Sequence, residues 1–91
     1  MHNLWLRVCA LLDVDPATVR EPVLKQVSLN LIEMFGGGYA MYHPGDNAIL
    51  YADEIDRGIL AHEYAHAVCW QSPDYNDGDN EARCQWVEQN I

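Results

Sequence analysis

His62-Glu63-Tyr64-Ala65-His66 is the stretch from which the rest of this 91-residue chain is best understood. On an α-helix, two histidines four positions apart lie on the same face, so both imidazoles can reach one metal ion. Glu63 lies one step round the helix and points near the open side of such a metal. In this HExxH pattern two neutral imidazoles hold Zn²⁺, and the glutamate takes a proton from the metal-bound water.

The residues around this pattern predict a helix that runs from Asp53 to Trp70. Asp53 is expected to cap the N-terminus, with Glu54 and Asp56 in the first turn. Apolar residues at spacings of three and four predict one buried stripe, formed by Ile55, Leu60, Ala61, Ala65 and Val68. The alternative to a metal site is a pair of surface histidines on an ordinary amphipathic helix.

A catalytic zinc site needs a third protein ligand and leaves the fourth position to water. No histidine follows His66, and the HExxHxxGxxH arrangement is excluded because Cys69 and Ser72 stand where it requires Gly and His. A final helix is expected from Asn80 to about Gln89, with Glu81 in its first turn. Glu81 is therefore the predicted third ligand, although acidic residues favour first turns for electrostatic reasons alone. The remaining candidates are Asp74, Asp77 and Asp79.

Two further residues are considered as neighbours of this site. Gln85, one turn after Glu81, could orient His62 or His66, because metal-ligating histidines usually hydrogen bond to a second group. Cys69 lies three positions after His66 and borders the site, but it is not counted as a ligand.

Composition limits the class of protein. A chain of 91 residues allows one domain, residues 1–91, and a bound metal can staple a domain this small. The net charge of −9, with only 5 Lys and Arg, argues against binding nucleic acid or an anionic membrane. The cysteines are odd in number and lack paired spacing, which favours a reducing, cytoplasmic location.

The N-terminal half predicts helices followed by a hairpin. Leu4 to Leu12 is expected to form a first helix ending near Asp13-Val14, and Asp15-Pro16 is typical of a helix start. Tyr39–His43 and Ala48–Ala52 flank the turn Pro44-Gly45-Asp46-Asn47 and predict a β-hairpin. Its outer strand could pair with an extended peptide or could simply end a small sheet.

Residues 23–35 fit two periodicities. The apolar positions Val23, Leu24, Val27, Leu31, Met34 and Phe35 fit a helix, whereas Val27, Leu29 and Leu31 alternate with polar residues as in a strand. A strand over Gln26–Glu33 is expected, because a two-stranded ribbon alone would be marginally stable.

The hairpin, the HExxH helix and the helix opening with Asn80-Glu81-Ala82 together resemble a compact gluzincin, a zincin metallopeptidase with a glutamate third ligand. Residues 38–51, Leu60–His66 and Glu81-Ala82 are similar to minigluzincins and to ImmA/IrrE-type metallopeptidases. The resemblance implies an α+β fold in which a short mixed or antiparallel sheet packs on the HExxH helix, with an N-terminal helix and a C-terminal glutamate-bearing helix. It also implies hydrolysis of a protein or peptide substrate by Zn²⁺, with His62, His66 and Glu81 as ligands and Glu63 as the base.

Three alternatives stay open at this point. The HExxH helix also resembles that of SprT/Spartan-type proteases, which use a downstream third histidine that this chain lacks. The residue that stabilises an oxyanion could be Tyr75, Tyr39, Tyr42 or Arg83. The domain could also be an inactive or latent zinc-stapled binding or regulatory module, in which a protein side chain closes the fourth position.

Overall fold

The structure, a computed structural model, describes residues 2–36, 40–75 and 80–91. Its elements in chain order are α1 (His2–Leu11), the 3-10 helix η1 (Pro16–Thr18), β1 (Val23–Gln26), α2 (Leu29–Met34), β2 (Ala40–His43), β3 (Ala48–Tyr51), α3 (Arg57–Gln71), the 3-10 helix η2 (Pro73–Tyr75) and α4 (Asn80–Asn90). Helices combined with one small mixed sheet confirm the predicted α+β class. In the described part of the chain, the helices are all too short or too polar to cross a membrane.

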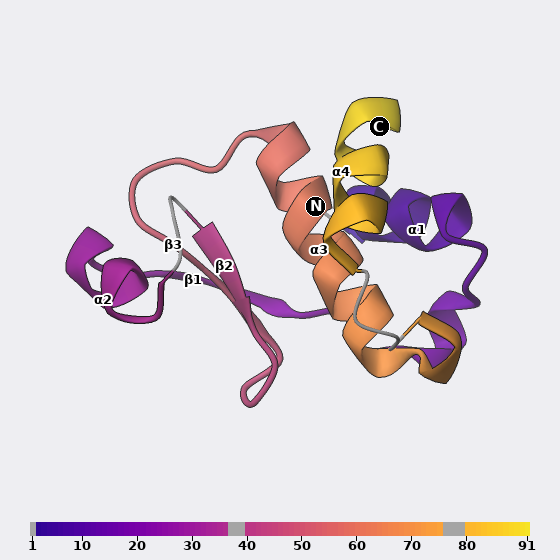
Figure 1. The fold of residues 1–91 in the computed structure, drawn as a ribbon, viewed down its shortest axis with the longest axis horizontal. Coiled ribbons are helices and arrows are strands. Elements are labelled where there is room, and N and C mark those ends of the chain that lie inside the picture. Colours follow the sequence, from indigo (N-terminus) through magenta and orange to yellow (C-terminus); the bar gives the residue numbers. More distant parts are fainter. Residues whose placement is uncertain (1, 37–39, 76–79) are drawn as a thin grey trace.

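The elements form successive layers (Figure 1). The sheet has the order β1-β3-β2, in which β3 pairs in parallel with β1 and antiparallel with β2. In Figure 1, α2 lies beyond one side of the sheet, α3 lies on the other, and α1 and α4 lie beyond α3. The helix that carries the HExxH pattern is therefore the central layer of the molecule.

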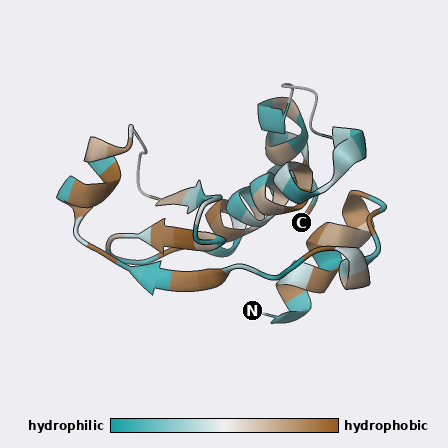
Figure 2. Ribbon diagram, turned by 90° about the horizontal axis from the view of Figure 1, so that it is seen from below, coloured by the Kyte–Doolittle hydropathy of each residue, from teal (hydrophilic) through white to brown (hydrophobic). Residues whose placement is uncertain are grey.

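Alternating residues of β3 divide between two hydrophobic clusters. Ile49 is fully buried in the larger cluster, which joins α1, α3 and α4. Ala48 and Leu50 point to the opposite face and pack with Ile32 of α2. This division follows from the two-residue period of a strand. Figure 2 shows that the helices mix hydrophobic and hydrophilic residues, as expected for elements with only part of their surface buried.

The HExxH helix is confirmed, but its start differs from the prediction. Asp56, not Asp53, is the N-cap, and its Oδ1 accepts a hydrogen bond of 2.8 Å from the N–H of Ile59. Asp53 lies before the helix because the chain leaves β3 at Tyr51 and runs without regular structure up to Asp56. The predicted stripe residues within the helix, Leu60, Ala61, Ala65 and Val68, are all buried.

The predicted strand over Gln26–Glu33 is wrong. The strand lies earlier, at Val23–Gln26, and residues 29–34 form α2. Ser28 caps α2 by accepting a hydrogen bond of 3.3 Å from the N–H of Leu31, a local signal that favours a helix start. β1 is held instead by its parallel pairing with β3.

The other predicted elements are confirmed. α1 and the final helix α4 match their expected ranges within two residues, and Asp15 caps the 3-10 helix that begins at Pro16. The hairpin forms with Ala40 opposite Tyr51 and His43 opposite Ala48. β2 lies at one edge of the sheet, next to α3, which brings the hairpin to the HExxH face.

Candidate metal centre

Two helices bring the three predicted ligands together. His62 and His66 lie on one face of α3, with ring centroids 5.0 Å apart, and Glu81 reaches them from the first turn of α4. The two oxygens of Glu81 divide between the histidines: Oε1 lies 3.0 Å from Nε2 of His62, and Oε2 lies 3.1 Å from Nε2 of His66. One carboxylate thus faces both imidazoles, as a shared ligand set requires.

Glu88 supports His62 from the other side of the ring. Its Oε1 lies 2.8 Å from Nδ1 of His62, so this nitrogen donates its proton to Glu88. In a neutral imidazole the Nε2 of His62 then carries a lone pair, and it faces a second acceptor, the oxygen of Glu81. Two acceptors at 3.0 Å repel unless a cation lies between them. A second proton or a metal ion would meet this need.

The electrostatics of His66 and Glu63 suit a metal with a neighbouring base. Burial lowers the pKa of His66, which favours the neutral imidazole that a metal needs. Glu63 is buried on the same helix, and burial raises its pKa to about 7, although His62 and the N–H of Tyr42 oppose this shift. A carboxyl group with this pKa can both accept and release a proton near neutral pH.

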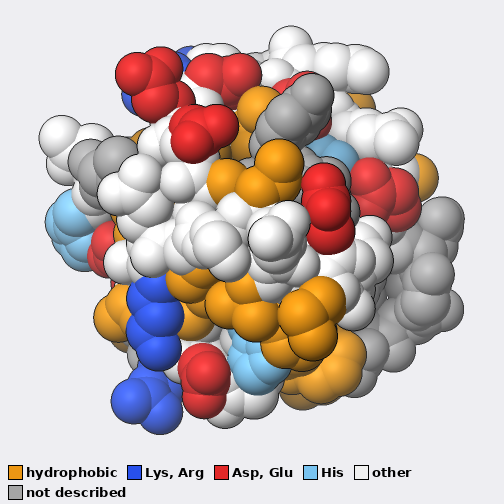
Figure 3. Space-filling model, turned by 90° about the vertical axis from the view of Figure 1, so that its left-hand side faces the viewer, with side chains coloured by type: hydrophobic (Ala, Val, Ile, Leu, Met, Phe, Trp, Pro, Cys, Tyr) orange, Lys and Arg blue, Asp and Glu red, His pale blue; other side chains and the backbone are white. Residues whose placement is uncertain are grey.

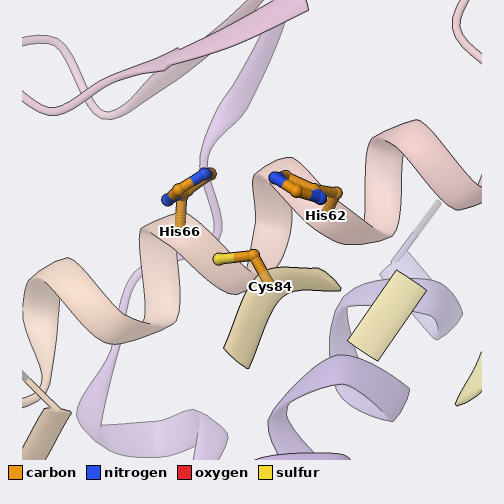
Figure 4. A group of neighbouring side chains, drawn as sticks. All are labelled: His62, His66 and Cys84. Atoms are coloured by element: carbon orange, nitrogen blue, oxygen red, sulfur yellow. The ribbon is translucent and has the colours of Figure 1, made fainter. Parts of the chain in front are cut away.

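Cys84 is a fourth potential ligand. Its sulfur and a ring nitrogen of each histidine all lie within 4.8 Å of one another. Figure 4 shows this sulfur reaching from α4 toward the two imidazoles. The thiol is fully buried, and its hydrogen bond with Cys69, together with burial, raises its pKa. Without a metal the thiol therefore remains protonated.

The other sequence candidates lie away from these residues or outside the described chain. Asp74 is exposed and lines a separate hollow with Tyr75. Gln85 is exposed, and within the described ranges no hydrogen bond joins it to either histidine; Glu88 has the supporting role instead. Asp77, Asp79 and Tyr39 lie outside the described residues.

Of the described oxyanion candidates, Tyr42 shares a cavity with the candidate ligands. It lines the cavity that contains His62, Glu63 and His66, and its hydroxyl donates a hydrogen bond of 2.8 Å to Asn47. The hydroxyl of Tyr75 instead donates to the carbonyl of Leu12 at 2.6 Å. Arg83 lies over the ring of Tyr75, 4.9 Å from its centroid.

The candidate ligands line a cavity of about 560 Å³ between β2 and α3. Its polar floor is formed by His62, Glu63, His66 and Glu81, and its walls include the apolar side chains of Phe35 and Trp70. Figure 3, which faces the α2 side of the molecule, shows a group of hydrophobic side chains on that face. Phe35 also contacts His43 edge-on, with ring centroids 5.7 Å apart.

Sequence reasoning missed Glu88 and Cys84. Both lie on the same face of α4 as Glu81: Cys84 is three positions further on and Glu88 is seven. That spacing is visible in the sequence, and it identifies both residues once Glu81 is accepted as facing the histidines.

Comparison with known proteins adds no relative. No protein-family model matches the chain, and neither a curated protein nor a solved structure is significantly similar to it.

Proposed function

We propose that the chain is a zinc-dependent metallopeptidase, an endopeptidase of the compact gluzincin type. His62, His66 and Glu81 hold Zn²⁺, and Glu63 is the general base. The observation that carries this proposal is the approach of both Glu81 oxygens to the Nε2 atoms of both histidines, at 3.0 and 3.1 Å. Three such donors leave one position open in a tetrahedral zinc site, as in catalytic zinc centres.

The donor set is one that zinc uses in proteins. Two imidazoles and a carboxylate are the ligands of one established class of catalytic zinc site. Ligands about 2.0–2.2 Å from a tetrahedral zinc lie roughly 3.3 Å from one another. The nitrogen–oxygen distances of 3.0 and 3.1 Å are hydrogen-bond lengths slightly below that separation, so zinc would enter after the side chains move apart by a few tenths of an ångström. When bound, Zn²⁺ supplies a Lewis acid and lowers the pKa of water to about 7.

The chain's own residues supply the remaining steps. Glu63 accepts a proton from the attacking water and passes it to the leaving amine, a role that suits a buried carboxyl group on the helix of the two histidines. The N–H of Tyr42 donates to its carboxylate and holds it beside β2. Glu88 orients the ring of His62 and makes its Nε2 more basic, and therefore a stronger ligand for the metal.

A protein or peptide is the substrate that the surroundings favour. β2 is an edge strand, so outer backbone groups other than the N–H of Tyr42, which donates to Glu63, could pair with an extended peptide. The net charge of −9 disfavours nucleic acid and anionic membranes as partners. The three cysteines are buried and form no disulfide in the described structure, which is in keeping with a cytoplasmic location.

Metal analysis of protein purified without chelators or a histidine tag tests the ligand set. About one zinc per wild-type chain is expected, with a clear loss in Glu81→Ala. Glu63→Gln is the matched variant, because it removes the base and keeps the ligands: zinc should remain while peptide cleavage is lost. Zinc content that is unchanged in Glu81→Ala would refute the ligand assignment, and an active Glu63→Gln would refute the base.

The position of Cys84 favours a second candidate, a closed zinc-stapled module without hydrolysis. Its sulfur lies within 4.8 Å of both histidine donors, and coordination would deprotonate the thiol. Substitution of the metal by Co²⁺ separates the two functions. A sulfur-to-cobalt charge-transfer band that disappears in Cys84→Ser supports the closed module, whereas a spectrum unchanged by that substitution supports the open catalytic site.

A further inference from the structure

Trp70 is a large apolar side chain left open to solvent beside the candidate metal ligands. It lies on α3 one turn after His66 and two turns after His62, so the three side chains share a helix face. Its exposed fraction is 54%, and it lines the cavity that contains both histidines. A single exposed apolar residue is common on protein surfaces, so the informative feature is that two of them, Trp70 and Phe35, line the cavity that also contains both histidines.

This cavity is the middle part of a longer groove. A second hollow of about 400 Å³ adjoins it and shares Tyr42, Pro44 and Trp70 with it. A third, of about 210 Å³, adjoins it on another side and shares Ala40, His62 and Glu63. The shared residues from Ala40 to Pro44 follow β2 along the sheet edge, and His62 to Trp70 follow α3. The groove therefore runs along both elements with the metal ligands between its ends.

We propose that this groove binds an extended peptide whose large apolar side chain packs on Trp70, next to the bond that is cleaved. This inference rests on the proposed function and adds the substrate class to it. An extended chain fits because the groove continues on both sides of the metal ligands along a sheet edge that no described strand covers.

The residues that line the groove near Trp70 determine which peptide side chain binds there. Trp70 and Pro44 offer apolar surface at the boundary between the central cavity and the 400 Å³ hollow. An aromatic or branched aliphatic side chain there would cover the exposed face of the indole and remove apolar surface from water. An acidic side chain is disfavoured, because Glu21 and Asp46 outnumber Arg20 in the lining of the 400 Å³ hollow and the chain has a net charge of −9. Trp70 is thus a specificity-determining residue and takes no part in the chemical step.

The test measures binding apart from turnover. Full-length Glu63→Gln, loaded with zinc, is titrated with acetyl-Ala-Ala-Phe-Ala-Ala-amide and with the same peptide carrying Ala or Asp in place of Phe. The Phe peptide is expected to bind about tenfold more tightly than the Ala peptide, and the Asp peptide more weakly than either. Trp70→Ala should abolish this preference, whereas Trp70→Phe should retain most of it.

Trp86→Ala is the matched control. Trp86 is similarly exposed, at 47%, and lies on α4 outside the three hollows, so its removal should leave the preference intact. A preference that survives Trp70→Ala, or that is absent although zinc is bound, overturns the inference and leaves the metal centre standing. Failure of the chain to bind zinc overturns the proposed function and this inference with it.

Discussion

Glu88→Ala is expected to weaken zinc binding although Glu88 is not a ligand. Glu88 accepts a hydrogen bond of 2.8 Å from Nδ1 of His62, and that bond fixes the ring so that Nε2 faces Glu81. Without Glu88, His62 loses both the preferred tautomer and the charge that makes its ligand nitrogen more basic. The same deletion leaves Glu81 and His66 in place, so the expected effect is graded rather than complete.

The geometry sets the size of this effect. Removing such a supporting partner costs 10–100-fold in metal affinity in known zinc sites. The side chain of Glu88 is 45% exposed, so water screens part of its charge. The lower end of the range applies, which is about tenfold, or roughly 1.4 kcal/mol of binding free energy. Glu88→Gln keeps an acceptor and loses the charge, so its affinity should fall between those of Glu88→Ala and the wild type.

Competition for Zn²⁺ against a chromophoric chelator, at fixed pH, measures these affinities. Gln85→Ala is the control, because Gln85 is exposed on the same helix and makes no hydrogen bond to His62 or His66 within the described residues. Circular dichroism of each metal-free variant checks that α4 is retained. An affinity of Glu88→Ala equal to that of Gln85→Ala would refute the view that Glu88 orients His62.

Three further predictions concern stability. Burial raises the pKa of Glu63 from 4.5 to about 7 in the folded, metal-free protein. The folded protein therefore binds a proton at Glu63 more tightly than the unfolded chain does. The free energy of unfolding consequently falls as the pH rises from 4.5 to about 7. With chelator present, Glu63→Gln should therefore melt at least about 4 °C above the wild type at about pH 8, and this gain should vanish near pH 4.5. Asp56→Ala should lower the free energy of unfolding by about 1 kcal/mol in urea titrations, because it removes the N-cap of α3. Asp53→Ala is the control and should change that free energy by less than about 0.5 kcal/mol. Equal losses in the two variants would contradict the cap assignment. Excess Zn²⁺ should raise the melting temperature of the wild type more than that of Glu81→Ala, and equal shifts would argue against Glu81 as a ligand.

Local patterns in the sequence predicted most of the elements. The apolar stripe of α3 and the turn residues between β2 and β3 act over a few positions, so they can be recognised without knowledge of the fold. The error at residues 26–33 arose where two local signals compete. The alternation of Val27, Leu29 and Leu31 favours a strand, but Ser28 caps a helix in which Ile32 is the buried residue. The parallel partner of β1 lies more than 20 residues away, and periodicity carries no information on it.

The composition of the candidate centre was harder to predict than its position. The spacing of His62 and His66 follows from helix geometry alone. Cys84 and Glu88 reach the histidines only because α4 turns one particular face toward α3, and that rotation depends on packing between the two helices. The buried pair Cys84 and Val87 on α4 marks this face in the structure.

α4 packs along α3, and Cys84 and Val87 are the buried residues among the 11 of the helix. A metal that bridges His62 and Glu81 would add a direct cross-link between α3 and α4. In thermodynamic terms, α4 and the ion would then open as one cooperative unit. Loss of zinc should therefore lower the free energy of local opening of α4 more than that of α3. The backbone amides of α4 would then exchange with solvent faster as the zinc concentration falls, so the order of the C-terminal helix would depend on the supply of metal.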